Sequence, residues 1–258
     1  MDLGLKGRRA LVSAASKGLG RACAEALARE SAEVFISSRD AGALAGLAGQ
    51  IGAAGHQAAD LTKRADVEAL VSAAAGALAG LDILVVNSGG PPAGSLEEVG
   101  DDAWEDAFKL TTMSATWLVR NALPHLKKSK QGRIVYLTSY LVKEPSDVLM
   151  LSNAFRPGVT AVARMLSHEL APLGVTVNCI GPNAILTDRT RSLAAGPAGD
   201  AGISLEEQLE RSASKLPMRR YGDPSEVGGL CAYLCSAQAG YITGQTIVID
   251  GGSTRFYA

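Results

Sequence analysis

The sequence is short of aromatic residues, histidine and cysteine, and it has no long apolar run. Phe, Trp and Tyr make up 5% of the 258 residues, so aliphatic side chains must fill the core. Three histidines and four cysteines offer few ligands for a metal, and we predict no metal site. Cys231 and Cys235 are one helical turn apart, which is typical of a buried helix face.

The sequence also lacks an excess of charge of either sign. The formal net charge is −1, which argues against a nucleic-acid partner. No apolar stretch reaches the length of a membrane span, so we expect no membrane association. The first residues are acidic and lack the basic and apolar regions of a signal peptide. We therefore predict a cytoplasmic protein.

Apolar runs of strand character alternate with helical patterns along the whole chain, with no internal repeat or linker. This alternation predicts an α/β fold, with a doubly wound parallel sheet of about seven strands covered by helices on both faces. Residues 1–258 are expected to form a single domain, with a mobile lid at about 187–217 that contains a flexible run at 194–199. The strands are expected near residues 10–12, 33–39, 56–61, 82–87, 133–139, 175–180 and 246–250, and the main helices near 21–28, 41–55, 64–79, 102–126, 152–173 and 224–235.

Residues 10–22 predict a strand, a tight turn of small residues and the start of a helix. The first N–H groups of a helix have no partner within it and carry the positive end of its dipole. Small residues let a phosphate approach that end closely. We therefore predict a nucleotide-binding turn, and the residues expected to contact the cofactor there are Ser13, Ala15, Ser16, Lys17, Gly18 and Leu19.

Three separated motifs resemble those of the short-chain dehydrogenase/reductase family. The spacing Ser13-Ala14-x-x-x-Gly18-x-Gly20 resembles its Thr-Gly-x-x-x-Gly-x-Gly turn. Residues 87–90, Asn-Ser-Gly-Gly, resemble its Asn-Asn-Ala-Gly motif, and residues 242–252 resemble its C-terminal strand and loop. The resemblance covers essentially the whole chain. It implies a Rossmann-type fold and a nicotinamide dinucleotide cofactor.

The end of the second strand bears on the choice between NAD and NADP. An acidic residue there would bind the ribose hydroxyls and repel a 2′-phosphate. This chain has Ser38 and Arg39 instead, and a guanidinium is a forked donor suited to phosphate. Lys17 adds a second positive charge nearby. We therefore expect NADP(H) to be favoured over NAD(H).

The resemblance implies further cofactor contacts after the other strands. Two substitutions affect this set: Ala14 replaces the first glycine of the turn, and Asn183 replaces the glycine after Pro182. An alanine at position 14 costs little if its φ is negative, and Asn183 is expected to tolerate a left-handed conformation. The additional residues expected to bind cofactor are Asp60, Leu61, Asn87, Ser88, Gly89, Arg156, Pro182, Asn183, Ile185 and Thr187.

The family's active site is a tetrad of Asn, Ser, Tyr and Lys, and here only the serine is kept. Ser139 matches it at the end of the fifth strand. The Tyr-x-x-x-Lys positions fall on Ser152 and Arg156, and the asparagine position falls on Thr111. A serine hydroxyl is far too weak an acid to replace a phenol, and a guanidinium stays protonated at neutral pH. We predict that the proton comes from Ser152, a water or the neighbouring Tyr140, although strand alternation favours a packing role for Tyr140.

These residues leave three functions open. One is an NADP(H)-dependent carbonyl reductase, which resembles the 3-oxoacyl-(acyl carrier protein) reductases. The others are a catalytically silent protein that binds NADP(H) or another ligand, and a non-redox enzyme on the same scaffold. The apolar residues 148–151 favour an apolar carbonyl or acyl substrate. The resemblance also implies a homo-oligomer, a tetramer or dimer formed through the two long helices and the last strand.

Overall fold

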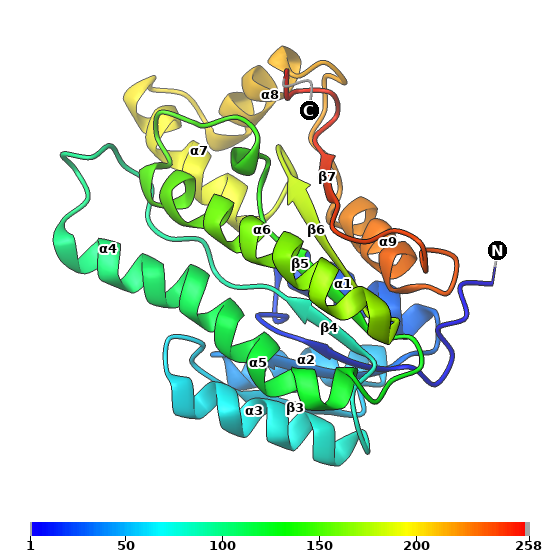
Figure 1. Ribbon diagram of the computed structural model, residues 1–258. Helices are drawn as coiled ribbons and strands as arrows, with labels where there is room; N and C mark the ends of the chain where they lie inside the picture. Colours follow the sequence, from blue (N-terminus) through cyan, green and yellow to red (C-terminus); the bar gives the residue numbers. More distant parts are fainter. Residues whose placement is uncertain (1, 256–258) are drawn as a thin grey trace.

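A computed structural model describes residues 2–255 and contains one seven-stranded parallel sheet (Figure 1). The strand order is β3-β2-β1-β4-β5-β6-β7, and the order turns back between β1 and β4, as in a Rossmann sheet. The predicted α/β fold is therefore confirmed. The strands are β1 (Arg9–Val12), β2 (Glu33–Ser38), β3 (Gly55–Ala58), β4 (Ile83–Val86), β5 (Arg133–Leu137), β6 (Thr176–Pro182) and β7 (Thr246–Ile249).

Helices cover both faces of the sheet and enclose two aliphatic cores. The central strands are buried on both sides, which is why they read as continuous apolar runs. One face carries α1 (Gly18–Arg29), α2 (Ala41–Ile51) and α9 (Pro224–Cys235), and the other carries α3 (Arg64–Ala77), α5 (Ser114–Leu126) and α6 (Met150–Leu170). Cys231 and Cys235 are fully buried on α9, as predicted.

Two predicted segments differ from the structure. The helix expected at 102–126 is divided into α4 (Asp101–Phe108), a π-helical turn η1 (Lys109–Met113) and α5. The run at 194–199, expected to be flexible, lies inside the helix α7 (Asp188–Asp200), because Thr187 caps that helix and its alanines favour helical backbone. The helix α8 (Leu205–Lys215) follows, and both helices lie beyond the end to which β6 points in Figure 1.

A cluster of charged and polar side chains around Asp82 lies at the other end of the sheet, where the strands β1 and β4 begin. Its carboxylate accepts hydrogen bonds from Arg9 Nε at 2.8 Å, Arg9 Nη2 at 2.9 Å and Ser129 Oγ at 2.6 Å. Burial by itself would raise the pKa of Asp82, but these hydrogen bonds outweigh it and hold the pKa far below its usual range. Asp82 therefore stays ionised and joins the starts of β1 and β4.

The structure also has two short 3₁₀ turns, η2 (Tyr140–Val142) and η3 (Ala171–Leu173). Within residues 2–255, no helix is both long and apolar enough to cross a membrane.

Candidate functional site

The turn after β1 is held by hydrogen bonds to the neighbouring strand end. Ser13 Oγ donates to the Asn87 carbonyl oxygen at 2.7 Å and accepts from the Asn87 N–H at 2.9 Å. The Asn87 side chain in turn donates to the Ala14 carbonyl oxygen at 3.1 Å. Ser13 is fully buried, so its hydroxyl joins β1 to β4, and the more exposed turn residues are left to face a ligand.

Ala14 does not meet the condition of a negative φ under which an alanine at this position would cost little. Its φ is +48°, in the left-handed region that an alanine enters at a cost of about 1–2 kcal/mol. Asn183 is not among the residues with positive φ, and the left-handed residue after β6 is the adjacent Ala184, at +52°. The Asn183 N–H donates to the Ile249 carbonyl oxygen at 3.0 Å, which keeps Asn183 in the extended ladder with β7.

The N-terminus of α1 is open. A Cβ on Gly20 would lie 2.4 Å from the Ala14 carbonyl oxygen, so only glycine allows this close approach. Lys17 occupies the N-cap position and makes no capping hydrogen bond, whereas Asp40 and Asp223 cap α2 and α9. No residue within the described chain 2–255 accepts a hydrogen bond from the N–H groups of Gly18, Leu19 or Gly20. These donors fit a phosphate.

The end of β2 presents one exposed cation. Arg39 follows Ser38, and its charge helps to lower the pKa of Asp60 across the strand end. Burial by itself would raise that pKa, but hydrogen bonds from the Thr62 N–H at 3.0 Å and hydroxyl at 2.8 Å also lower it. Leu61 is buried in the core, so only its backbone could contact a cofactor.

Ser139 stands at the end of β5, as predicted. Its hydroxyl oxygen accepts a hydrogen bond from the Leu141 N–H at 3.3 Å and begins the turn η2. This leaves the hydroxyl proton free for an incoming oxygen atom. Tyr140 turns elsewhere, because its phenol interacts with Ser146, and burial raises the pKa of that phenol. The packing role favoured for Tyr140 fits this position.

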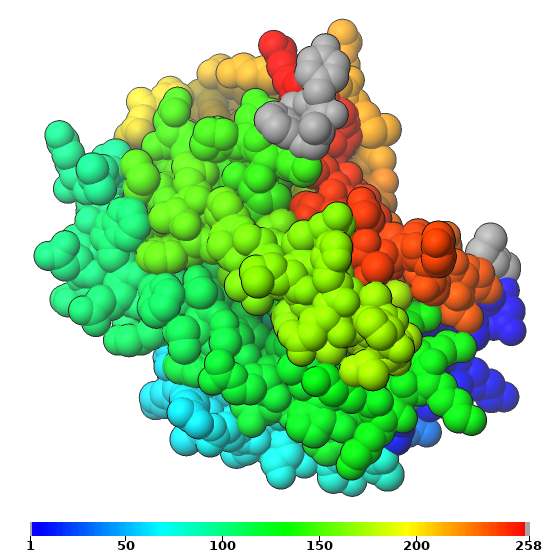
Figure 2. Space-filling view, viewed as in Figure 1, coloured from blue at the N-terminus to red at the C-terminus, as the bar shows by residue number. Residues whose placement is uncertain are grey.

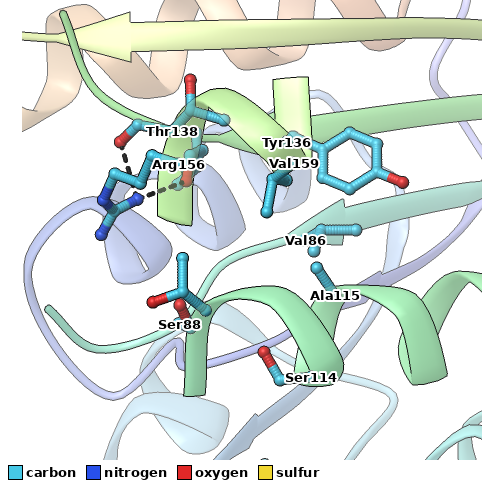
Figure 3. A pocket seen from close by; sticks show the side chains of 10 residues that line it. Val86, Ser88, Ser114, Ala115, Tyr136, Thr138, Arg156 and Val159 are labelled. Carbon is cyan, nitrogen blue, oxygen red and sulfur yellow. Dashed lines mark hydrogen bonds between the residues drawn. The ribbon is translucent and has the colours of Figure 1, made fainter. Parts of the chain in front are cut away.

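Arg156 is anchored to the backbone at the end of β5, just before Ser139 (Figure 3). Its Nη1 atom donates to the carbonyl oxygens of Leu137 at 3.3 Å and Thr138 at 3.0 Å. Burial, and to a smaller extent the charge of Arg189, lower the pKa of Arg156 to about 10. The guanidinium therefore remains charged at neutral pH. Ser152 lies one turn earlier on the same face of α6, buried, and its hydroxyl has no hydrogen-bond partner within residues 2–255.

Thr111 reaches the same place from the π-helical turn η1. Ser114 Oγ donates to the Leu110 carbonyl oxygen at the end of this widened turn. Thr111 Oγ1 is buried and has no hydrogen-bond partner among residues 2–255. It lines a pocket of about 10 Å³, the size of one water, together with Ser88, Thr138 and Arg156 (Figure 3). Tyr136 also lines it, but its phenol points away from Arg156.

The segment after β6 closes over the opening turn. Pro182 and Ile185 are buried, and Thr187 caps α7. A Cβ on Gly18 would lie 3.7 Å from Thr187 Cγ2, so the start of α7 lies directly against the turn between β1 and α1. Asp188 forms an exposed ion pair with Lys17 at 3.9 Å.

Sequence reasoning missed Arg189. This residue lies in the first turn of α7, and its Nη2 atom donates to the Pro91 carbonyl oxygen at 2.5 Å. The charged run 188–191, which directly follows Thr187 in the predicted lid, was the signal that could have identified it.

The comparisons with known proteins agree with this arrangement. The family model described as enoyl-(acyl carrier protein) reductase matches residues 13–254. The 3-oxoacyl-(acyl-carrier-protein) reductase of Vibrio cholerae is 31% identical over 97% of this chain and 98% of its own length. The chain therefore belongs to the short-chain dehydrogenase/reductase family, whose members of this type are oxidoreductases.

Two solved structures are also similar. L-sorbose reductase from Gluconobacter frateurii, complexed with NADPH and L-sorbose, has a TM-score of 0.93 and 27% identity, with full coverage of both chains. A short-chain oxidoreductase from Pseudomonas aeruginosa PAO1, described as containing an atypical catalytic center, has a TM-score of 0.90 and 27% identity over 98% of this chain and all of its own. A nicotinamide dinucleotide is thus the supported cofactor class.

Proposed function

We propose that this protein is an NADP(H)-dependent carbonyl reductase, similar to 3-oxoacyl reductases, in which Ser152 and Arg156 replace the usual Tyr and Lys. The single observation that carries the proposal is the placement of three features at one edge of the sheet: the open N-terminus of α1, the Ser139 hydroxyl and the Arg156 guanidinium. The solved relative with an atypical catalytic center supports the idea that this scaffold accepts a changed active site.

The open turn fits the dinucleotide. The N–H groups of Gly18, Leu19 and Gly20 would hold its diphosphate, and Asn87 keeps the turn in shape through the Ala14 carbonyl. Asp60 and Ser88 would flank the adenosine half, and Thr187 the nicotinamide half. The bound cofactor would supply the hydride.

The residues of this chain would then polarise the carbonyl group. Because Ser139 Oγ already accepts from Leu141, its proton is directed to the carbonyl oxygen. Arg156 adds positive charge where negative charge develops. The proton itself would come from a water that Thr111 Oγ1 holds beside Arg156, since that hydroxyl is buried and has no other partner in the described part of the chain. Such a route is slower than transfer from a placed phenol.

A direct assay tests the proposal. The purified protein is mixed with NADPH and a panel of 3-oxoacyl thioesters and small ketones, and nicotinamide absorbance is followed. We expect slow turnover. NADPH binding without any turnover would favour a catalytically silent binding protein, the second candidate, for which the favouring observation is that Ser152 and Arg156 stand on α6 in place of the family's Tyr and Lys. Failure to bind NADPH would favour a non-redox enzyme.

Replacing Arg39 is expected to reduce the preference for NADP(H). Because an exposed guanidinium can form charged hydrogen bonds with the 2′-phosphate, Arg39→Ala should weaken NADPH binding by about tenfold and leave NADH binding unchanged. Isothermal titration of both cofactors measures this. Arg29→Ala, an exposed cation at the far end of α1, is the control. An equal loss of affinity for NADPH and NADH would show that Arg39 does not contact the 2′-phosphate.

We also propose that the chain is a homo-oligomer, a dimer or tetramer assembled through α5 and α6. These helices lie next to each other on the face seen in Figure 2. A groove of about 230 Å³ between them is lined by Val119, Leu123, Val162 and Leu166. Met165 and Val162 on α6 are 73% and 44% exposed, so this face presents apolar surface that a second copy of the chain could cover. Light scattering gives the oligomeric state directly.

A further inference from the structure

Two guanidinium groups at the candidate site have no acidic partner. Arg156 donates to the carbonyl oxygens of Leu137 and Thr138, and Arg189 donates to that of Pro91. Within residues 2–255, neither guanidinium has a carboxylate within 4.0 Å. The neighbouring cations differ: Arg191 pairs with Glu206 at 3.0 Å, and Lys17 pairs with Asp188 at 3.9 Å. Among the described residues, Arg133 and Arg164 likewise donate only to carbonyl oxygens, so Arg156 and Arg189 are distinguished by their place at the candidate site.

The two arginines reach the site from two different helices. Arg156 projects from α6 to the end of β5, in the wall of the pocket that Ser88 also lines. Arg189 projects from α7 onto Gly90, in the loop that begins at Ser88. A Cβ on Gly90 would lie 3.2 Å from Arg189 Nε and 3.4 Å from its Cζ. Arg189 is exposed, so a ligand that enters the site can reach it.

The charges of the two groups act on each other. The charge of Arg189 is one of the two causes that lower the pKa of Arg156, and the two cations therefore repel each other across the site. An anion between them would remove this repulsion and accept forked hydrogen bonds from both. The diphosphate of a cofactor already has separate donors at the open N-terminus of α1.

We propose that Arg189 and Arg156 together bind an anionic group of the substrate, a carboxylate or phosphate, beside Ser139. The proposal rests on the proposed function and names its substrate class: a carbonyl compound that also carries an anionic group. Arg189 is the specificity-determining residue of the pair, since it lies outside the hydrogen bonds that anchor α6 to β5. An apolar part of the substrate is compatible with this, since Val148 in the apolar segment 148–151 is 63% exposed, whereas Leu151 is fully buried in a small core with Val99 and Ala107.

The test compares matched charged and neutral probes. These are 3-oxopentanoate and 4-oxopentanoate with their methyl esters, and dihydroxyacetone phosphate with dihydroxyacetone. In the natural protein, kcat/KM is expected to favour the anionic member of each pair. Arg189→Gln should reduce this preference about 10- to 100-fold, mainly through KM, and Arg189→Lys should restore part of it. Arg191→Gln, which changes an exposed cation of the same helix, should keep the preference.

Three outcomes would overturn the proposal. One is a natural protein that reduces the neutral members as well as the anionic ones, in which case the reductase function stands and the anion site fails. Another is equal loss for both members in Arg189→Gln. The third is weaker NADPH binding in that variant with an unchanged preference, which would assign Arg189 to the cofactor phosphates.

Equilibrium binding separates this proposal from the proposed function. If no probe is turned over, calorimetric titration of the same acids and esters still measures binding at the site. Binding of the anions, lost in Arg189→Gln and kept in Arg191→Gln, would support the anion site while the reductase function fails. Binding of neither member of any pair would reject the anion site.

Discussion

The double variant Ser152→Tyr/Arg156→Lys is expected to reduce ketones about a hundred- to ten-thousand-fold faster than the natural protein, the range that a placed general acid provides. Ser152 and Arg156 share one face of α6, and Arg156 lies against the backbone next to Ser139. A phenol at position 152 would therefore point toward the same carbonyl oxygen as Ser139. A lysine one turn later would favour the ionised phenol and so make it a better proton donor at neutral pH. Single-turnover and steady-state kcat with NADPH measure the gain.

The control for this variant carries the same bulk without the hydroxyl group. Ser152 is only 7% exposed, so a tyrosine ring must displace its neighbours, and a change in activity could come from that displacement alone. Ser152→Phe/Arg156→Lys creates the same crowding and should show no gain. Thermal unfolding of both variants shows whether they are folded. A folded tyrosine variant that is no faster than the phenylalanine variant would mean that the missing proton donor does not limit the reaction.

The position of the site could be predicted from the sequence because it depends on strand ends. Parallel strands bring the residues after their carboxyl ends to one edge of the sheet, so Asn87 and Ser139 could be placed there from apolar runs and the small residues that follow them. The hydrogen bonds that hold this site together could not be predicted in the same way. The hydrogen bonds of Ser13 and Asn87 connect β1 to β4 across more than seventy residues, and no local pattern encodes them.

The remaining differences have the same cause. The positive φ of Ala14 depends on where its carbonyl must meet Asn87, so local preference alone suggests the opposite sign. The segment 102–126 has the sequence periodicity of an ordinary helix over most of its length, so the π-helical turn at Thr111 could not be distinguished within it. Arg189 is one charge in a charged run, and only its contact with Gly90 and Pro91 distinguishes it from Arg191. Each of these features is set by packing between segments distant in sequence.

The substitution Asp82→Asn is expected to lower the free energy of unfolding by about 2–3 kcal/mol, between the value of an exposed pair and that of a fully buried one. The side chain of Asp82 is 11% exposed and that of Arg9 is 30% exposed, so solvent screens part of the interaction. An asparagine keeps the shape but leaves the Arg9 guanidinium without its counter-charge, with Arg8 also nearby. In a chain of this length, such a loss corresponds to a fall in Tm of roughly 4–12 °C. Denaturant unfolding and calorimetry measure both quantities.

The stabilisation that Asp82 provides is expected to decrease at acid pH. The pKa of Asp82 is lower in the folded protein than the value of about 3.9 in the unfolded chain. Its contribution is therefore complete above about pH 5 and is lost as the pH falls through the folded-state value. The difference in stability between the natural protein and Asp82→Asn should be constant near neutral pH and shrink below about pH 4. Glu68→Gln, which breaks an exposed pair with Arg64 on α3, should have a much smaller effect at every pH. A constant difference down to acid pH would show that Asp82 acts by packing and not by charge.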